Sequence, residues 1–202
     1  MYKKPDFYTE QAKKTGYPAR SVFKLEELDG KYGLCLPGRN ILDIGAAPGS
    51  WSLYCLRKIK KNGSITAVDL QEILEKELRR GENVHLLRGD IADAAVKADL
   101  AELSPYDLVL SDAAPNTTGN KTADCGRSFT LVANIITFTL PLLREGGDLV
   151  VKVFQGGGEA ELMQLLRPHF TKVKGMKPKA SRNNSFETFY VGKGKVTPPS
   201  SF

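Results

Sequence analysis

The chain has 202 residues, of which 41% are hydrophobic and 26% charged, a composition typical of a globular protein with core enough for one domain. Its 29 lysines and arginines against 23 aspartates and glutamates give a net charge of +6, which is a mild basic excess. Three scattered cysteines and only two histidines argue against a disulfide framework or a metal site. No signal peptide is evident, and the longest apolar stretch, residues 131–143, is too short to cross a bilayer. We therefore expect a cytoplasmic monomer without a membrane or metal partner.

Strand and helix patterns alternate along the chain. A helix is predicted over residues 20–32, where apolar side chains recur at helical spacing, and Pro37-Gly38 stops the chain before the first strand. Seven strands are predicted, at residues 40–44, 64–69, 84–88, 107–111, 148–154, 172–176 and 187–192. Further helices are expected between them, the longest at 127–144 and another at 159–167, while the polar residues 116–126 predict a flexible loop.

This alternation predicts an α/β fold with a doubly wound, seven-stranded, mostly parallel sheet and helices on both faces. Only residues 177–185 separate the last two predicted strands, too few for a helical crossover. The last strand should therefore be antiparallel and pair with its predecessor as a hairpin-like unit.

Basic residues gather towards both ends of the chain. Eight lie between residues 167 and 195, opposed there only by Glu187: Arg167, Lys172, Lys174, Lys177, Lys179, Arg182, Lys193 and Lys195. Six more lie near the N-terminus: Lys3, Lys4, Lys13, Lys14, Arg20 and Lys24. The clustering suggests a surface that binds a polyanion, and ordinary solvated charge is the alternative.

The segment Asp43-Ile-Gly-Ala-Ala-Pro-Gly-Ser-Trp51 joins a predicted strand to a helix through a glycine-bearing turn. Such a turn presents backbone N–H groups and a helix N-terminus to a ligand, and Gly45 and Gly49 let the backbone turn sharply. The three-glycine dinucleotide fingerprint is missing, which favours a nucleoside with a charged tail over a pyrophosphate. An ordinary tight turn is the alternative.

Three acids follow neighbouring predicted strands: Asp69, Asp90 and Asp112. Ligands of open α/β sheets bind outside the carboxyl ends of the strands. Asp69 is placed to accept hydrogen bonds from a ribose diol, and Asp90 from an exocyclic amine such as that of adenine. A helix N-cap is the alternative role, especially for Asp90.

Lys152 lies inside the apolar strand pattern of residues 148–154. Burying a charged amine is costly, so burial favours the neutral form, which can act as a general base. A lysine at the strand's end that reaches solvent is the alternative.

Five separated motifs then resemble one family, in the same order. They are Phe23-Lys24-Leu25, the 43–51 turn, Ser111-Asp112-Ala-Ala-Pro115, Val151-Lys152-Val-Phe154, and Lys177-Pro-Lys-Ala-Ser-Arg182 with Ser185-Phe-Glu187. Together they resemble the FtsJ/RrmJ family of RNA 2′-O-ribose methyltransferases over residues 13–191. The resemblance implies a Rossmann-like methyltransferase domain over residues 1–195, with a helical, basic, RNA-facing segment at 1–36 and a loose tail at 196–202.

The resemblance also implies the site. A catalytic tetrad would comprise Lys24, Asp112, Lys152 and Glu187, with Lys152 as the base. S-adenosylmethionine would bind at Gly45, Gly49, Trp51, Asp69, Asp90 and Asp112. The bacterial branch methylates a uridine of large-subunit (23S) ribosomal RNA in the assembled subunit, so ribosomal RNA is the expected partner.

Some alternatives remain open. Ser50 stands where the bacterial ribosomal branch usually has a second glycine, and it resembles the eukaryotic tRNA branch, so a tRNA or cap ribose is a second substrate candidate. Gly45 and residues 152–156 match the ribosomal branch instead. The complete tetrad disfavours a non-catalytic RNA-binding assembly factor. The broken glycine fingerprint disfavours a nicotinamide-dependent oxidoreductase.

Overall fold

The computed structural model describes residues 7–181 and 185–197. Along the chain its elements are α1 (Phe7–Lys14), α2 (Val22–Tyr32), β1 (Asn40–Ile44), α3 (Ser50–Ile59), β2 (Ser64–Asp69), α4 (Lys76–Arg80), β3 (Val84–Arg88), α5 (Ala94–Glu102), β4 (Tyr106–Ser111), α6 (Lys121–Thr139), β5 (Leu143–Phe154), α7 (Glu159–Leu166), the 3-10 helix η1 (Arg167–His169), β6 (Phe170–Met176) and β7 (Glu187–Lys195). Within these ranges no helix is long and apolar enough to cross a membrane.

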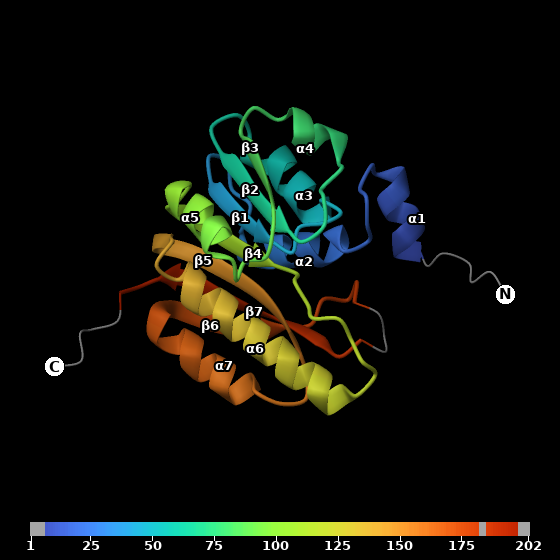
Figure 1. The fold of residues 1–202 in the computed structure, drawn as a ribbon. Helices are drawn as coiled ribbons and strands as arrows, with labels where there is room; N and C mark the ends of the chain where they lie inside the picture. Colours follow the sequence, from blue (N-terminus) through green and yellow to red (C-terminus); the bar gives the residue numbers. More distant parts are fainter. Residues whose placement is uncertain (1–6, 182–184, 198–202) are drawn as a thin grey trace.

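The strands form one seven-stranded sheet in the order β3-β2-β1-β4-β5-β7-β6 (Figure 1). β7 runs antiparallel to both of its neighbours, and the other described pairs are parallel. The predicted α/β class, the antiparallel last strand and its pairing with β6 are thus confirmed. The position of β7 between β5 and β6 was not predicted from the sequence.

The burial of these two strands explains their order. β7 carries Phe189, Tyr190 and Val191, all buried. Phe189 and Val191 pack into the core on one face of the sheet, and Tyr190 packs into the core on the other. In β6, Lys172 and Lys174 are exposed. Lysines on an outermost strand keep their amines in water and discourage pairing with other chains. The basic strand therefore lies at the edge, and the apolar strand that follows it in sequence lies inside.

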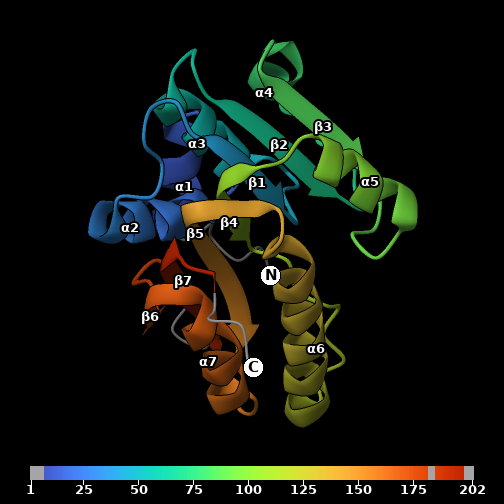
Figure 2. The ribbon, with the colours of Figure 1, turned by 90° about the vertical axis from the view of Figure 1, so that its left-hand side faces the viewer.

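Alternate residues of each strand pack into two separate cores. Ile41, Leu108, Leu110 and Val150 face α2 and α3, and the neighbouring side chains of the same strands face α5, α6 and α7. Figure 2 shows α1, α2 and α3 on one side of the sheet and α5 and α6 on the other. This two-sided burial explains why the central strands appear in the sequence as continuous apolar runs.

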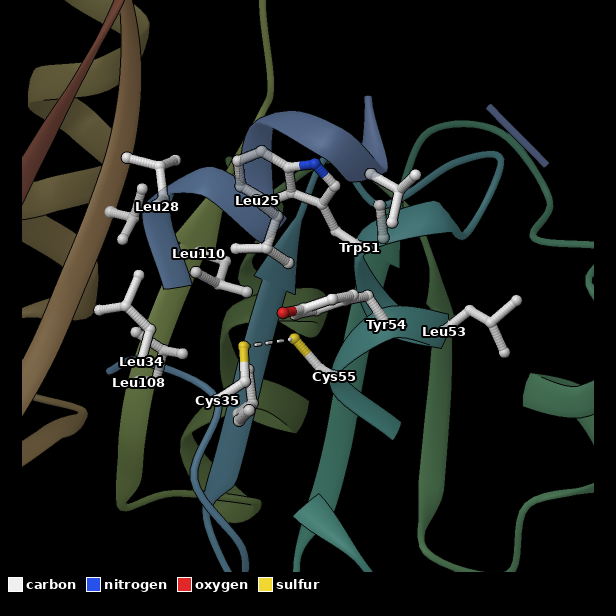
Figure 3. Packing of buried hydrophobic residues seen from close by; sticks show 14 of the residues in the cluster. Leu25, Leu28, Leu34, Cys35, Trp51, Leu53, Tyr54, Cys55, Leu108 and Leu110 are labelled. Atoms are coloured by element: carbon white, nitrogen blue, oxygen red, sulfur yellow. Dashed lines mark hydrogen bonds between the residues drawn. The ribbon is translucent and has the colours of Figure 1, made fainter. Parts of the chain in front are cut away.

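Leu25 of α2 and Trp51 and Tyr54 of α3 belong to the first of these cores (Figure 3). In the same core the thiols of Cys35 and Cys55 lie 3.4 Å apart as free cysteines, and Cys125 is also free. The packing fixes α2 against α3 and so determines where the side chains of α2 lie relative to the sheet.

Helix α6 differs most from its predicted bounds of 127–144. It begins at Lys121 because Asn120 caps it, its side chain accepting a hydrogen bond from the Ala123 N–H at 3.2 Å. It ends at Thr139, just before Pro141, whose ring cannot continue a helix. Residues 143–147 instead extend β5, where Leu143 pairs with Tyr106.

The first residues of the predicted C-terminal tail are held by the fold. The Val196 N–H donates to the His169 carbonyl at 2.9 Å, and the Thr197 hydroxyl donates to Glu145 at 2.5 Å. The rest of the tail, the first residues of the predicted RNA-facing segment, and Arg182 of the last motif lie outside the described residues.

Candidate active site

A pocket of 590 Å³ opens at the carboxyl ends of β1 to β4, and we call it the strand-end pocket. Four of the predicted cofactor residues line it: Gly45, Asp69, Asp90 and Asp112. Leu70, Ile91, Leu131 and Ile135 add an apolar part to the same lining. An apolar pocket with a few convergent polar groups is the usual form of a small-molecule site.

The loop after β1 packs closely against the loop after β4 because Gly45 has no side chain. Its φ is +75°, and a Cβ there would lie 2.7 Å from the Cα of Ala113 in the loop after β4. The Gly45 and Ala46 N–H groups both donate to the Val68 carbonyl, at 2.9 and 3.2 Å. The loops after β1 and β4 thus touch backbone to backbone, and a larger residue would push them apart.

Asp69 is oriented by the backbone around it. Its Oδ2 accepts from the Ala47 N–H at 2.9 Å, and its Oδ1 accepts from the Gln71 N–H at 2.8 Å. Asp90 is exposed, and its Oδ1 accepts from the Ala92 N–H at 2.8 Å. The N-cap residue of α5 is Asp93, so Asp90 is not the helix cap considered as its alternative role.

Gly49 and Trp51 lie outside the lining of this pocket. Gly49 precedes α3 at a φ of +109° and faces Leu78. Trp51 is 2% exposed, and its Nε1 donates to the Ser21 carbonyl at 2.9 Å, just before α2. Its ring lies 5.7 Å from that of Phe189. The structure therefore assigns Trp51 a packing role that positions α2, and its cofactor contact stays a prediction.

Ser50, the residue that suggested a tRNA substrate, has a structural role of its own. It is 1% exposed, and its hydroxyl accepts from the Ala19 N–H at 2.8 Å. A glycine could not make this bond between α3 and the segment before α2. The structure therefore gives Ser50 a packing role of its own.

The four predicted tetrad residues come together on one face of the sheet. Lys152 is 8% exposed, and its Nζ lies 2.8 Å from Asp112 Oδ1 and also donates to the Asp112 carbonyl. Lys24 Nζ, from α2, lies 2.6 Å from Glu187 Oε1. Phe154 pairs with Glu187 and Lys152 with Phe189 across β5 and β7, so Lys152 and Glu187 point to the same side.

The charges of this cluster are balanced locally. Burial opposes ionisation of Glu187, but the hydrogen bond from Lys24, the charges of Lys24 and Lys152 and the Ser181 hydroxyl outweigh it, so the pKa of Glu187 lies below its usual range. The Ser181 hydroxyl donates to Glu187 Oε1 at 2.8 Å. Each lysine of the cluster therefore faces a carboxylate.

Asp43 is a candidate site residue that the sequence analysis did not single out. It is 1% exposed, and Ser52 donates to its Oδ2 at 2.6 Å, while its Oδ1 has no hydrogen-bond partner within the described residues. Burial raises the pKa of Asp43 to about 7, assisted by the charges of Asp112 and Asp69 and opposed by the Ser52 hydrogen bond. An aspartate inside an apolar strand was the signal in the sequence.

A second pocket, of 380 Å³, lies on the other side of the tetrad, and we call it the α2–β7 pocket. Its lining is Arg20, Ser21, Lys24, Thr117, Phe154, Ser185, Phe186 and Glu187. Asn116 lines the strand-end pocket and the adjacent Thr117 lines this one, so one loop borders both. Asp112 lines the strand-end pocket, and Lys24 and Glu187 line the α2–β7 pocket. The Lys152–Asp112 pair therefore lies between the two pockets.

That loop is shorter and better anchored than the predicted flexible loop of residues 116–126, because residues 121–126 begin α6. Asp124 accepts from the Thr118 N–H at 2.9 Å and from the Gly119 N–H at 3.2 Å. The pKa of Asp124 is lowered, mainly by the hydrogen bond from the Thr118 backbone and further by those from the Thr118 side chain, Arg127 and Gly119. Desolvation of the carboxylate opposes this shift. The segment between the two pockets is therefore held against the helix.

Comparison with known proteins settles the class. A family model described as FtsJ-like methyltransferase matches residues 17–195. The chain belongs to this family. The resemblance noted in the sequence is thereby confirmed, as are the expectations of a methyltransferase and of S-adenosylmethionine as methyl donor.

Relatives and solved structures agree with the assignment. The chain is 44% identical over 191 residues to the ribosomal RNA large subunit methyltransferase E of Treponema denticola, covering 95% of both chains. It is 45% identical over 188 residues to the protein of that name from Borreliella afzelii, covering 93% of this chain and 97% of the relative. A crystal structure described as a ribosomal RNA methyltransferase of Plasmodium falciparum is 31% identical with a TM-score of 0.78, covering 89% and 98%. Fibrillarin from Aeropyrum pernix, 16% identical at a TM-score of 0.58 over 85% and 76%, shares the fold.

Proposed function

We propose that this FtsJ-like methyltransferase transfers a methyl group from S-adenosylmethionine to a ribose 2′-hydroxyl of large-subunit ribosomal RNA, at a uridine in the assembled subunit. Relatives at 44 and 45% identity over nearly the whole chain carry the name of a large-subunit ribosomal RNA methyltransferase. The uridine and the assembled subunit come from the resemblance to the bacterial branch. The observation that carries the reaction is the buried Lys152–Asp112 pair between two pockets.

The residues of the strand-end pocket fit the proposed cofactor. Asp69 and Asp90 offer carboxylate oxygens to ribose hydroxyls and an adenine amine, and the apolar part of the lining suits the flat base. Asp43 does not line the pocket itself but immediately precedes Ile44 and Gly45 of the lining, and its Oδ1, which has no partner within the described residues, suits a hydrogen-bond donor such as an ammonium group. When bound, the cofactor supplies a methyl group activated by its positively charged sulfur.

Lys152 is the proposed base. A ribose 2′-hydroxyl is a weak acid and a weak nucleophile, so its proton needs an acceptor placed on it. For this role the Lys152 ammonium first loses a proton to water, after which its Nζ accepts the proton of the 2′-hydroxyl, and Asp112, at 2.8 Å, stabilises the ammonium that re-forms. Lys24 and Glu187 hold the ribose from the α2–β7 side, and Ser181 keeps the Glu187 carboxylate in place. Most of the catalysis is then positioning.

The test is labelled-methyl transfer to large ribosomal subunits, free ribosomal RNA and tRNA in parallel, followed by mapping of the modified ribose. We expect label in the large subunit, at one 2′-position. Label in tRNA alone would show that tRNA is the substrate and would leave the proposed methyl transfer intact. The absence of label from all three RNAs would overturn the proposal. We further propose a monomeric, cytoplasmic protein in which residues 1–195 act as one domain and residues 1–36 face the RNA.

A further inference from the structure

The α2–β7 pocket contains an aromatic pair that the proposed chemistry does not use. The rings of Phe154 and Phe186 lie 4.8 Å apart at an interplanar angle of 62°. Phe154 is 9% exposed at the end of β5, whereas Phe186, just before β7, is half-buried. Lys121 Nζ, at the start of α6, lies 5.8 Å from the centre of the Phe186 ring. Three segments distant in sequence thus meet here: two supply the rings of an aromatic wall, and the third supplies a cation over the Phe186 ring.

This wall directly adjoins the tetrad. Phe154 pairs with Glu187 across β5 and β7, and it is two residues from Lys152 on the same face of the strand. Phe186 immediately precedes Glu187, and both line the pocket. A ribose with its 2′-hydroxyl at Lys152 carries its base at the neighbouring carbon of the sugar, so the base enters the space beside the wall.

The dimensions and chemistry of the pocket suit a single nucleotide. Its 380 Å³ lies near the lower end of the roughly 300–1,000 Å³ that is usual for small-ligand pockets. Proteins read unpaired RNA bases by stacking them on aromatic rings, and enzymes that modify nucleotides turn the target out of its stack. Arg20 and Lys24 in the pocket lining, and Lys121 over the Phe186 ring, are basic side chains that suit the adjoining phosphates.

We propose that Phe186, supported by Phe154, is the stacking surface for the base of the target nucleotide, which enters the α2–β7 pocket turned out of its RNA stack. This inference rests on the proposed function and adds the residue that holds the base. A ring face stacks on any base, so Phe186 selects an extruded nucleotide and does not distinguish uracil from cytosine.

The test compares Phe186→Leu, which keeps an apolar side chain without a ring, with Phe186→Tyr, which keeps the ring. Phe138→Leu is the matched control, because Phe138 is also half-buried with a lysine, Lys97, 5.6 Å from its ring centre, but it lies on α6 outside the lining of the α2–β7 pocket. Removing the stacking surface should raise the KM for large subunits by about 5- to 150-fold. Phe186→Tyr and Phe138→Leu should stay close to wild type. Affinity for S-adenosylmethionine should be unchanged in all three variants, and Phe186→Leu and Phe138→Leu should lower the Tm by similar small amounts because each removes a half-buried ring.

A binding assay isolates the stacking itself. The probes are two RNA hairpins that contain the mapped nucleotide, one intact and one abasic at that position. Wild type should prefer the intact hairpin by a similar factor, and Phe186→Leu should bind the two alike. Equal binding of both hairpins by wild type, or full preference retained in Phe186→Leu, would overturn the inference while leaving methyl transfer established. A wild-type protein that methylates no RNA would remove the proposed function and this inference with it.

Discussion

Lys152 Nζ lies 2.8 Å from Asp112 Oδ1 in a position that is only 8% exposed, so the fifth strand and the end of the fourth are joined by an ion pair inside the protein. A buried pair of this kind gains little net stability over an apolar pair, and breaking it leaves one charge unpaired. Its position between the strand-end pocket and the α2–β7 pocket suits the role in catalysis proposed for it.

Replacing Lys152 with alanine should lower kcat by about 100-fold or more, because a positioned general base contributes about 10²- to 10⁴-fold. Affinity for S-adenosylmethionine, measured by calorimetry, should change little, since Lys152 does not line the strand-end pocket. Lys152→Arg is the matched control. It can keep the ion pair with Asp112, but arginine stays charged and cannot accept the proton, so it should also be inactive. Near-normal turnover in either variant would remove Lys152 from the mechanism.

Asp43 should make the protein less stable as the pH rises. Its pKa is raised from 3.8 to about 7, so between those values the unfolded chain is ionised while the folded protein keeps the proton. Stability is therefore lost across that window, by up to roughly 4 kcal/mol, and the loss levels off above it. Asp43→Asn should remove this part of the pH dependence in urea unfolding and should also weaken S-adenosylmethionine binding.

The comparison for Asp43 is the difference between wild type and Asp43→Asn at each pH, because other groups titrate in both proteins. The variant should gain relative stability as the pH rises from about 4 to about 8. A difference that stays constant over this range would show that Asp43 is already ionised at low pH in the folded protein.

Gly45→Ala should destabilise the protein and reduce cofactor binding together. The new Cβ would lie 2.7 Å from the Ala113 Cα at a φ of +75°, which costs about 1–3 kcal/mol in strain and forces the two loops apart. Gly126→Ala is the control, because Gly126 lies within α6 and a Cβ there meets nothing within 4 Å. That change should stabilise by about 0.5–1 kcal/mol. Thermal unfolding and calorimetry measure both effects, and a Gly45→Ala protein with wild-type cofactor affinity would contradict the proposed fit.

RNA affinity should depend on the basic residues near the tetrad. Lys179 is exposed, and its backbone N–H donates to Glu27 of α2 at 2.8 Å, which holds it beside the α2–β7 side of the molecule. Lys179→Ala should reduce the slope of log K against log salt by about 1. Lys61→Ala is the control, since Lys61 is equally exposed but precedes β2, at the opposite ends of the strands. Equal salt slopes for the two variants would place the RNA elsewhere.

Much of the site could be predicted because it follows local patterns. The bounds of β1, β2 and β3 match their apolar runs, and the acids after β2, β3 and β4 reach one pocket because parallel strands end at one edge. The tetrad residues were named from motifs, and the sheet brings them together. Asp43 was not predicted as a site residue because it begins the glycine turn of residues 43–51. A carboxylate within an apolar strand is, however, an independent indication of a functional site.

By itself the sequence determined the alternation of strands and helices, the glycine turn and the choice of candidate site residues, because these depend on periodicity and on residues close together in the chain. The tertiary structure decided that β7 lies between β5 and β6, that Trp51 packs beneath α2, and that Phe154 and Phe186 meet beside Glu187. These contacts join segments far apart in sequence. These contacts are stabilised by the burial of apolar surface between segments, which no single segment can achieve alone. No local sequence pattern therefore predicts them.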